Sequence, residues 1–135
     1  LKPGGRLAAE FGGQGNVAAI VTALTALGRQ HGFDQALANP WYFPTAEEYA
    51  ELLEAHGLVV DEIRLIPRPT PLPTGLRGWI ETFRKPFFAA AGEQADALLD
   101  EAEAVLAPAL RDSRGNWTAD YVRLRVLARK PKVDG

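Results

Sequence analysis

The sequence predicts an α/β fold in which three strands are separated by helices. One observation behind this prediction is that apolar residues recur at helical spacing in several segments. A second is that short runs of branched or small apolar residues, bounded by glycine and proline, lie between those segments. A third is size, because 135 residues, 47% hydrophobic and 24% charged, suit one soluble domain with a modest core.

The first predicted strand covers residues 6–11 and follows the turn Lys2-Pro3-Gly4-Gly5. Proline presets φ at the second position of a type II turn, and glycine supplies the positive φ at the third. A glycine loop at 12–15 comes next, with Asn16 as the predicted N-cap of a helix. The apolar stripe of that helix consists of Val17, Ile20, Val21, Leu24 and Leu27.

Residues 40–44 place three aromatic side chains between two prolines, which predicts a rigid loop. Thr45 and Glu48 then form a capping box, and Gly57 is positioned to end the short helix that follows.

The second predicted strand, 58–66, is rich in branched apolar residues. From 67 to 73 every other residue is proline, which predicts a polyproline-like connection that ends the strand.

A helical insertion is expected within residues 67–112, and it includes the proline linker. Its two helices are separated at Gly92, and Pro86 is a predicted kink in the first of them. The last strand, about 117–129, shows the clearest alternation of apolar and polar residues, and residues 130–135 read as a tail.

Composition narrows the classes of function. The 15 basic and 17 acidic residues are interspersed, which argues against a nucleic-acid footprint or a polybasic membrane patch and favours a small-molecule partner. The absence of cysteine excludes disulfides, thiolate metal sites and cysteine nucleophiles. No apolar run approaches the roughly eighteen residues of a membrane span, so we expect a cytoplasmic protein. The chain has no methionine, and we expect it to begin within a longer protein.

Four separated stretches resemble class I S-adenosylmethionine-dependent methyltransferases, in particular a bacterial subgroup similar to trans-aconitate methyltransferase and to cyclopropane-fatty-acid-synthase-like proteins. These stretches are residues 9–16, 39–44, 68–72 and 117–121. The turn at 2–5 and a final strand after a helical excursion fit the same pattern.

The resemblance implies a Rossmann-like fold, of which this chain is the C-terminal part of one domain. Strands five, six and seven of a mixed sheet would be 6–11, 58–66 and 117–129, with strand seven antiparallel between the other two. S-adenosylmethionine would be the cofactor of the parent protein. The Gly-x-Gly-x-Gly loop that binds it is absent here, and the glycine loop at 12–15 is a weak signal that usually means tight backbone geometry.

Candidate substrate-binding residues follow from the rule that ligands lie beyond the carboxyl ends of parallel strands. Glu10, Phe11 and Asn16 are therefore expected at the mouth of the active site; the alternative is sheet packing for the first two and a helix cap for Asn16. Trp41 and Tyr42 either line a substrate pocket or pack their loop against the core.

Two further candidates lie in or beside the predicted insertion. Trp79 is expected to act as a lid over the acceptor, and core packing is its alternative. Arg68 would grip a carboxylate-bearing acceptor or remain a solvated charge. Arg123, Arg125 and Arg129 share one face of the last strand, and we expect them to pair with acidic residues of the covering helices.

The function predicted for the parent protein is methyl transfer to a small, carboxylated or lipid-like acceptor. The fragment alone is expected to be inactive, with no catalytic or metal-binding residue assigned. The alternative is a non-enzymatic binding or dimerisation module. Because an exposed strand edge recruits partners, we also expect a homodimer or a swapped assembly through residues 6–11.

Overall fold

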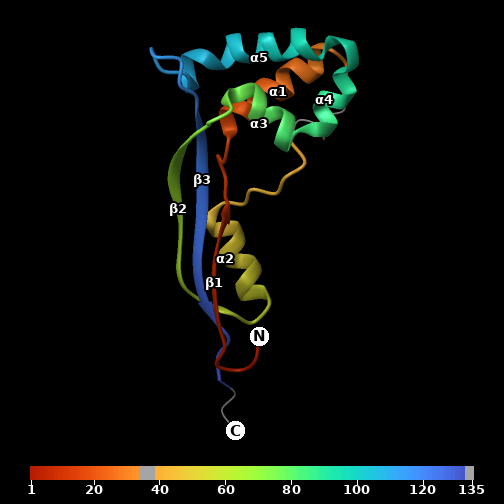
Figure 1. The fold of residues 1–135 in the computed structure, drawn as a ribbon. Helices are drawn as coiled ribbons and strands as arrows, with labels where there is room; N and C mark the ends of the chain where they lie inside the picture. Colours follow the sequence, from red (N-terminus) through yellow and green to blue (C-terminus); the bar gives the residue numbers. More distant parts are fainter. Residues whose placement is uncertain (34–38, 133–135) are drawn as a thin grey trace. The chain divides into compact units, whose positions relative to one another are not determined.

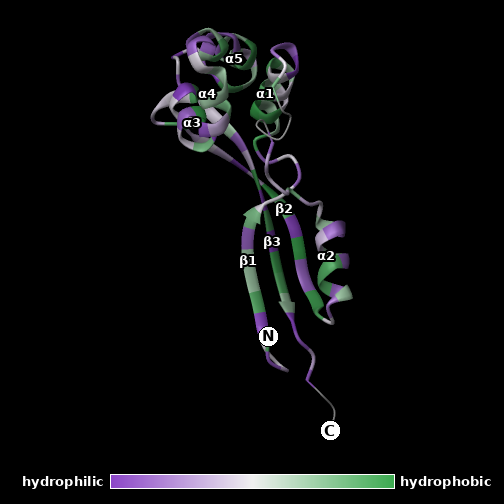
Figure 2. Ribbon diagram, turned by 90° about the vertical axis from the view of Figure 1, so that its right-hand side faces the viewer, coloured by the Kyte–Doolittle hydropathy of each residue, from purple (hydrophilic) through white to green (hydrophobic). Residues whose placement is uncertain are grey.

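The computed structural model describes residues 1–33 and 39–132. Among these residues, no helix combines the length and the apolar character that crossing a membrane requires. In Figure 2, hydrophobic and hydrophilic residues alternate along the strands, as a sheet with one buried face requires.

The chain divides into two compact units, and each is described by itself. The first unit contains Leu1–Asn16, Tyr42–Arg68 and Tyr121–Gly135. The second contains Val17–Trp41 and Pro69–Asp120. The chain is of α/β class, as predicted, with the sheet chiefly in the first unit and most of the helices in the second (Figure 1).

A three-stranded antiparallel sheet forms the first unit. Its strands are β1 (Arg6–Gly12), β2 (Val59–Pro71) and β3 (Thr118–Arg129), in the order β1-β3-β2. In the antiparallel register of β1 and β3, Arg6 lies opposite Arg129 and Gly12 lies opposite Arg123. β3 therefore separates β1 from β2, and its direction is opposite to that of β1 (Figure 1).

The turn that precedes β1 has the predicted geometry. Gly4 has a φ of 80°, and the N–H of Gly5 donates to the carbonyl of Lys2 at 2.8 Å. Positive φ at the third position and this hydrogen bond define a type II turn. The prediction from Lys2-Pro3-Gly4-Gly5 is confirmed.

Helix α2 (Ala46–Ala55) supplies apolar side chains to the core of the first unit. It begins as predicted, because the Thr45 hydroxyl accepts a hydrogen bond from the Glu48 N–H at 3.0 Å. Gly57 follows the helix with a φ of 81°. The core of this unit consists of Leu53, Leu124, Val126 and Ala128, with partly buried neighbours on β1, β2 and α2.

Strand β2 is longer than the sequence indicated, because it continues through Pro71 instead of ending at Ile66. The physical reason is its position at an edge of the sheet. Proline has no N–H to donate to a neighbouring strand, and prolines at alternate positions leave all of these gaps on the same side of their strand. An edge strand tolerates such gaps on its open side, where no neighbouring strand needs the donors. The proline pattern was therefore compatible with a strand.

Five helical segments lie in the part of the second unit that the structure describes. They are α1 (Ala18–Gln30), α3 (Gly75–Phe83), α4 (Lys85–Ala91), η2 (Gly92–Gln94) and α5 (Ala95–Leu110). α5 packs against α1, α3 and α4. The predicted kink near Pro86 is a break between α3 and α4, with Pro86 in the first turn of α4, where its missing N–H costs nothing.

The start of α1 corrects one prediction. Asn16 is not the N-cap of this helix; Val17 occupies that position with a φ of 46°. The side chain that accepts a hydrogen bond from the first turn is Asp120, whose Oδ2 receives the Ala19 N–H at 3.0 Å. A cap supplied from 101 residues away leaves no local sequence signal.

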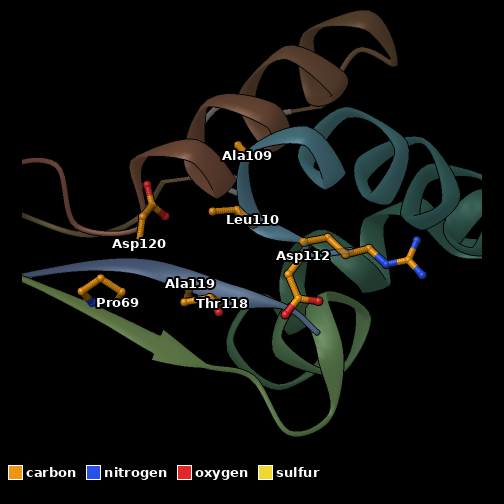
Figure 3. Close-up of a pocket in the computed structure, with 8 residues that line it drawn as sticks. Pro69, Ala109, Leu110, Asp112, Thr118, Ala119 and Asp120 are labelled. Carbon is orange, nitrogen blue, oxygen red and sulfur yellow. The ribbon is translucent and has the colours of Figure 1, made fainter. Parts of the chain in front are cut away.

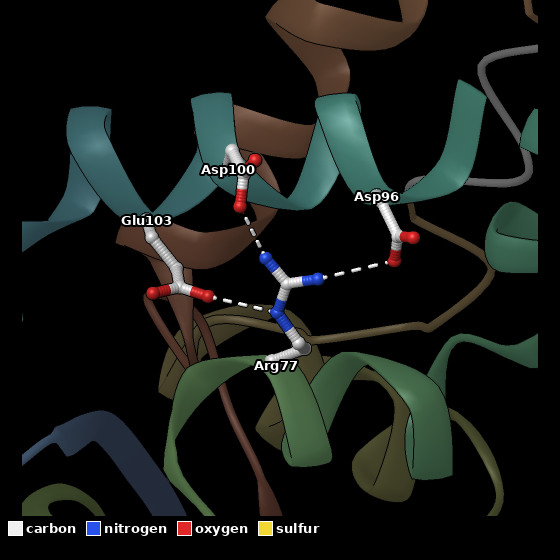
Figure 4. Close-up of polar contacts among 4 residues, drawn as sticks. All are labelled: Arg77, Asp96, Asp100 and Glu103. Carbon is white, nitrogen blue, oxygen red and sulfur yellow. Dashed lines mark hydrogen bonds and ion pairs between the residues drawn. The ribbon is translucent and has the colours of Figure 1, made fainter.

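Arg77 links α3 to α5 through three carboxylates (Figure 4). Its Nε lies 3.0 Å from Glu103 Oε1 and its Nη1 lies 3.3 Å from Asp96 Oδ1, while Nη2 donates to Asp100. The hydrogen bond to Glu103 is the main reason why the pKa of Arg77 is raised above its ordinary value. The positive guanidinium thus offsets the mutual repulsion of the three carboxylates along α5.

We expect Arg77→Met to lower the free energy of unfolding by about 1 kcal/mol, because partly exposed ion pairs each contribute only a fraction of that amount. The methionine keeps the apolar stem, so the loss reports on charge. The difference from the wild type, measured by urea unfolding, should shrink at about 1 M salt, where charges are screened within about 3 Å. Arg114→Met, which removes an exposed charge from the same unit, is the control; an equal loss in both variants would contradict the linking role.

Candidate functional site

A polar cluster lies at the carboxyl end of β1 and combines two of the predicted site residues. Glu10 Oε1 is 3.8 Å from Arg68 Nε and 3.9 Å from Arg123 Nε. Arg123 Nη2 also donates to the Glu10 carbonyl at 3.3 Å. All three side chains are partly exposed, so one carboxylate sits between two guanidinium groups within reach of solvent. A cluster with this excess of positive charge suits an anionic group.

Phe11 faces the opposite side of the sheet from Glu10, since successive side chains of a strand alternate. Its ring meets that of Tyr49 at a centroid distance of 4.9 Å and an interplanar angle of 69°. Phe11 packs against the core beneath α2. The structure therefore does not bring Phe11 and Glu10 to one surface.

Asn16 is buried, and its Oδ1 accepts a hydrogen bond from the Val122 N–H at 2.8 Å. The glycine loop packs closely around it. A Cβ at Gly12 would lie 2.8 Å from Asn16 Nδ2 and 2.7 Å from a ring carbon of Phe43. A Cβ at Gly13 would lie 3.0 Å from that of Leu124. Side chains thus pack directly against Gly12 and Gly13, which explains why neither position has room for a Cβ.

The last strand corrects another expectation. Among the described residues, the acidic partners of Arg123 and Arg129 lie on the neighbouring strands and not on covering helices. Arg123 pairs with Glu10 of β1, and Arg129 Nε lies 3.1 Å from Asp61 Oδ1 of β2. Cross-strand neighbours on one face of a sheet are close enough for such pairs, and the central position of β3 gives it neighbours on both sides.

An aromatic cluster in the second unit contains Trp41 and Trp79. Their ring centroids are 6.2 Å apart, and Trp79 also lies 5.3 Å from Phe83. The Arg84 guanidinium is placed over the Trp41 ring, 5.2 Å from its centroid. Trp79 is only 5% exposed and Arg84 is equally buried, whereas Phe83 is 54% exposed. Tyr42, in the first unit, is exposed at its surface.

Arg84 was not among the residues predicted from the sequence. Burial lowers the pKa of this guanidinium below its ordinary value, and the nearby aromatic faces partly compensate for lost hydration. A signal was available, because Arg84 follows Leu76 and Ile80 at four-residue intervals. A charged residue on the apolar stripe of a helix is a candidate for a buried role.

Among the described residues, no three His, Cys, Asp or Glu side chains form a group able to hold a metal ion. The polar and aromatic clusters belong to different units, so each is considered separately as a binding surface.

Comparison with known proteins adds one similarity. The chain is 36% identical to an uncharacterized methyltransferase of Schizosaccharomyces pombe over 135 aligned positions, which cover 96% of the chain and 51% of the relative. The chain therefore spans about half the length of the curated relative that it matches. No family model matches the chain. The α/β architecture is compatible with part of a methyltransferase, and the similarity supports that class without naming a subgroup.

Proposed function

We propose that the chain is the C-terminal part of a class I S-adenosylmethionine-dependent methyltransferase domain. The observation that carries this proposal is the similarity to a methyltransferase along almost the whole chain. Because the match covers about half of the relative, the proposal leaves the remaining half of the domain to the parent protein. S-adenosylmethionine would be bound chiefly by that other half, and we assign no cofactor-binding residue to this chain.

The sheet supports the same proposal. In the family that the sequence resembles, strand seven lies antiparallel between strands five and six. Here β3 lies between β1 and β2 and is antiparallel to β1. We therefore assign β1, β2 and β3 to strands five, six and seven, and the helices α3 to α5 to the insertion within residues 67–112.

β1 is an edge strand of the described sheet, so one of its sides has no neighbouring strand there. Its free edge would pair with another strand of the parent sheet, and in the isolated chain it would pair with a second copy. This edge is also the feature that favours the alternative function, a non-enzymatic dimerisation module.

The acceptor would be small and either carboxylated or lipid-like. Arg68 and Arg123 beside Glu10 would bind its carboxylate, and Asn16 would hold the adjoining loop in place. Tyr42, in the same unit, would contact the acceptor through its exposed ring. Phe11 would support this surface from the core side. Trp41 and Trp79 lie in the second unit and are proposed separately, as a candidate aromatic surface for an apolar group.

The chemistry needs little from this chain beyond positioning. S-adenosylmethionine supplies an activated methyl group on a sulfonium, which is already a good leaving group. The protein then contributes orientation and exclusion of water, and a strong catalytic base is unnecessary. We accordingly assign no catalytic residue.

Calorimetry with S-adenosylhomocysteine tests the proposal on two proteins, the full-length parent and the 135-residue chain. We expect saturable micromolar binding by the parent and none by the chain, because the main cofactor loop lies outside it. Absence of binding by the parent would contradict methyltransferase function and favour the dimerisation module. Micromolar binding by the chain alone would contradict the proposal that the cofactor is bound chiefly by the other half of the domain.

A further inference from the structure

A pocket in the described part of the second unit lies where the end of α5 meets the start of β3 (Figure 3). It has a volume of about 390 Å³. Its lining residues are Pro69, Ala109, Leu110, Arg111, Asp112, Thr118, Ala119 and Asp120. Small and aliphatic side chains form much of the wall, while charged groups come from the turn after α5 and from β3. This volume is at the small end of the range for ligand sites.

Asp120 lines this pocket, and one of its two carboxylate oxygens is buried without a hydrogen-bond partner among the described residues. Its Oδ2 accepts the Ala19 N–H at 3.0 Å, and its backbone carbonyl accepts the Val17 N–H at 3.0 Å. Less than 1 Å² of Oδ1 is exposed, and this oxygen has no hydrogen-bond partner among the described residues. Most buried polar atoms in folded proteins are paired, so an unpaired acceptor on a residue that lines a pocket is a candidate partner for a donor group of a ligand.

A second carboxylate, Asp112, adds negative charge at the same pocket. Its Oδ1 accepts the N–H groups of Arg114 and Asn116 at 2.9 and 2.8 Å. These bonds, chiefly the one from the Asn116 backbone, lower the pKa of Asp112 below its ordinary value and favour the ionised form. The Arg111 guanidinium lies beside Gly115, 3.3 Å from the position of a Cβ on that residue. The charged residues that line the pocket are therefore two carboxylates, Asp112 and Asp120, and one guanidinium, Arg111, which leaves an excess of one negative charge.

We propose that this pocket binds a small organic cation, an ammonium group carried on a compact apolar body. The ammonium would donate to Asp120 Oδ1 as that side chain turns its free oxygen toward the ligand, and Asp112 would add longer-range attraction. Ala119 and Pro69 would contact the apolar body. The proposal does not depend on methyl transfer, and it concerns residues of the second unit only.

Benzylammonium at pH 7 is the probe, with benzyl alcohol and benzoate as neutral and anionic controls of the same shape. We expect benzylammonium to shift the backbone amide NMR signals of Thr118, Ala119 and Asp120 with a dissociation constant of about 1 mM, as befits a ligand of this size. Benzoate should leave these signals unchanged, and benzyl alcohol should bind at least tenfold more weakly. Equal responses to all three probes would overturn the proposal.

Three variants of the whole chain complete the test. Asp120→Asn removes the charge and should weaken benzylammonium binding about tenfold or more. Ala109→Leu fills the pocket from an exposed helical position, so it should abolish binding without lowering the unfolding midpoint. Asp96→Asn, a change at an exposed carboxylate outside the pocket, should bind like the wild type. Unchanged binding by folded Ala109→Leu would overturn the proposal even if Asp120→Asn failed to fold.

Discussion

Trp79→Ala should lower the free energy of unfolding by about 3–5 kcal/mol, the usual cost of removing a large buried aromatic side chain. Trp79 is 5% exposed and meets the rings of Trp41 and Phe83. Its removal would leave a cavity in the second unit and uncover the Trp41 ring beneath Arg84. Urea unfolding of the whole chain, followed by circular dichroism, measures the shift of the midpoint.

Phe83→Ala is the matched control for this variant. Phe83 belongs to the same aromatic cluster, but it is 54% exposed, and we expect a loss of about 1 kcal/mol or less. A small loss for Trp79→Ala, combined with weaker acceptor binding by the parent protein, would instead favour the lid role that the sequence suggested. Similar losses for both aromatic residues would contradict the central position of Trp79.

Asn16→Ala should lower the free energy of unfolding by about 2 kcal/mol, because it leaves the partly buried Val122 N–H without its acceptor. The hydrogen bond joins residues 106 positions apart, so its loss should also loosen the glycine loop against β3. Amide hydrogen exchange at Val122 provides the local measurement, and we expect it to accelerate.

Gln14→Ala is the control for Asn16, since Gln14 belongs to the same loop and is exposed. It should leave both the unfolding midpoint and the exchange of the Val122 amide unchanged. If Asn16→Ala kept wild-type stability and exchange, the hydrogen bond to β3 would not be what holds the loop.

Local patterns predicted the elements whose causes are local. The turn before β1 needs only proline and glycine at adjacent positions, and its geometry is as expected. Thr45 and Glu48 lie three residues apart and start α2 as a capping box. The strand end predicted at Ile66 was wrong, because β2 continues through Pro71. Prolines interrupt the hydrogen bonding of a central strand, but an edge strand such as β2 tolerates them.

The candidate sites were only partly predictable. Glu10 and Arg68 were candidates from their places beside strand ends, but their approach to Arg123 depends on the position of β3 between β1 and β2. Arg84 is buried because α3 ends against the aromatic cluster, and its helical spacing from Leu76 and Ile80 was the local signal for this burial.

The sequence by itself determined the α/β class, the apolar stripes of the helices and the turns that separate elements, because each follows from residues close together along the chain. Only the tertiary structure decided that Asp120 caps α1, that Asn16 binds β3 and that Glu10 lies between two arginines. These contacts join residues far apart in the chain. The physical reason is that hydrogen bonds and ion pairs depend on distance in space, which sheet order and packing set and local periodicity does not.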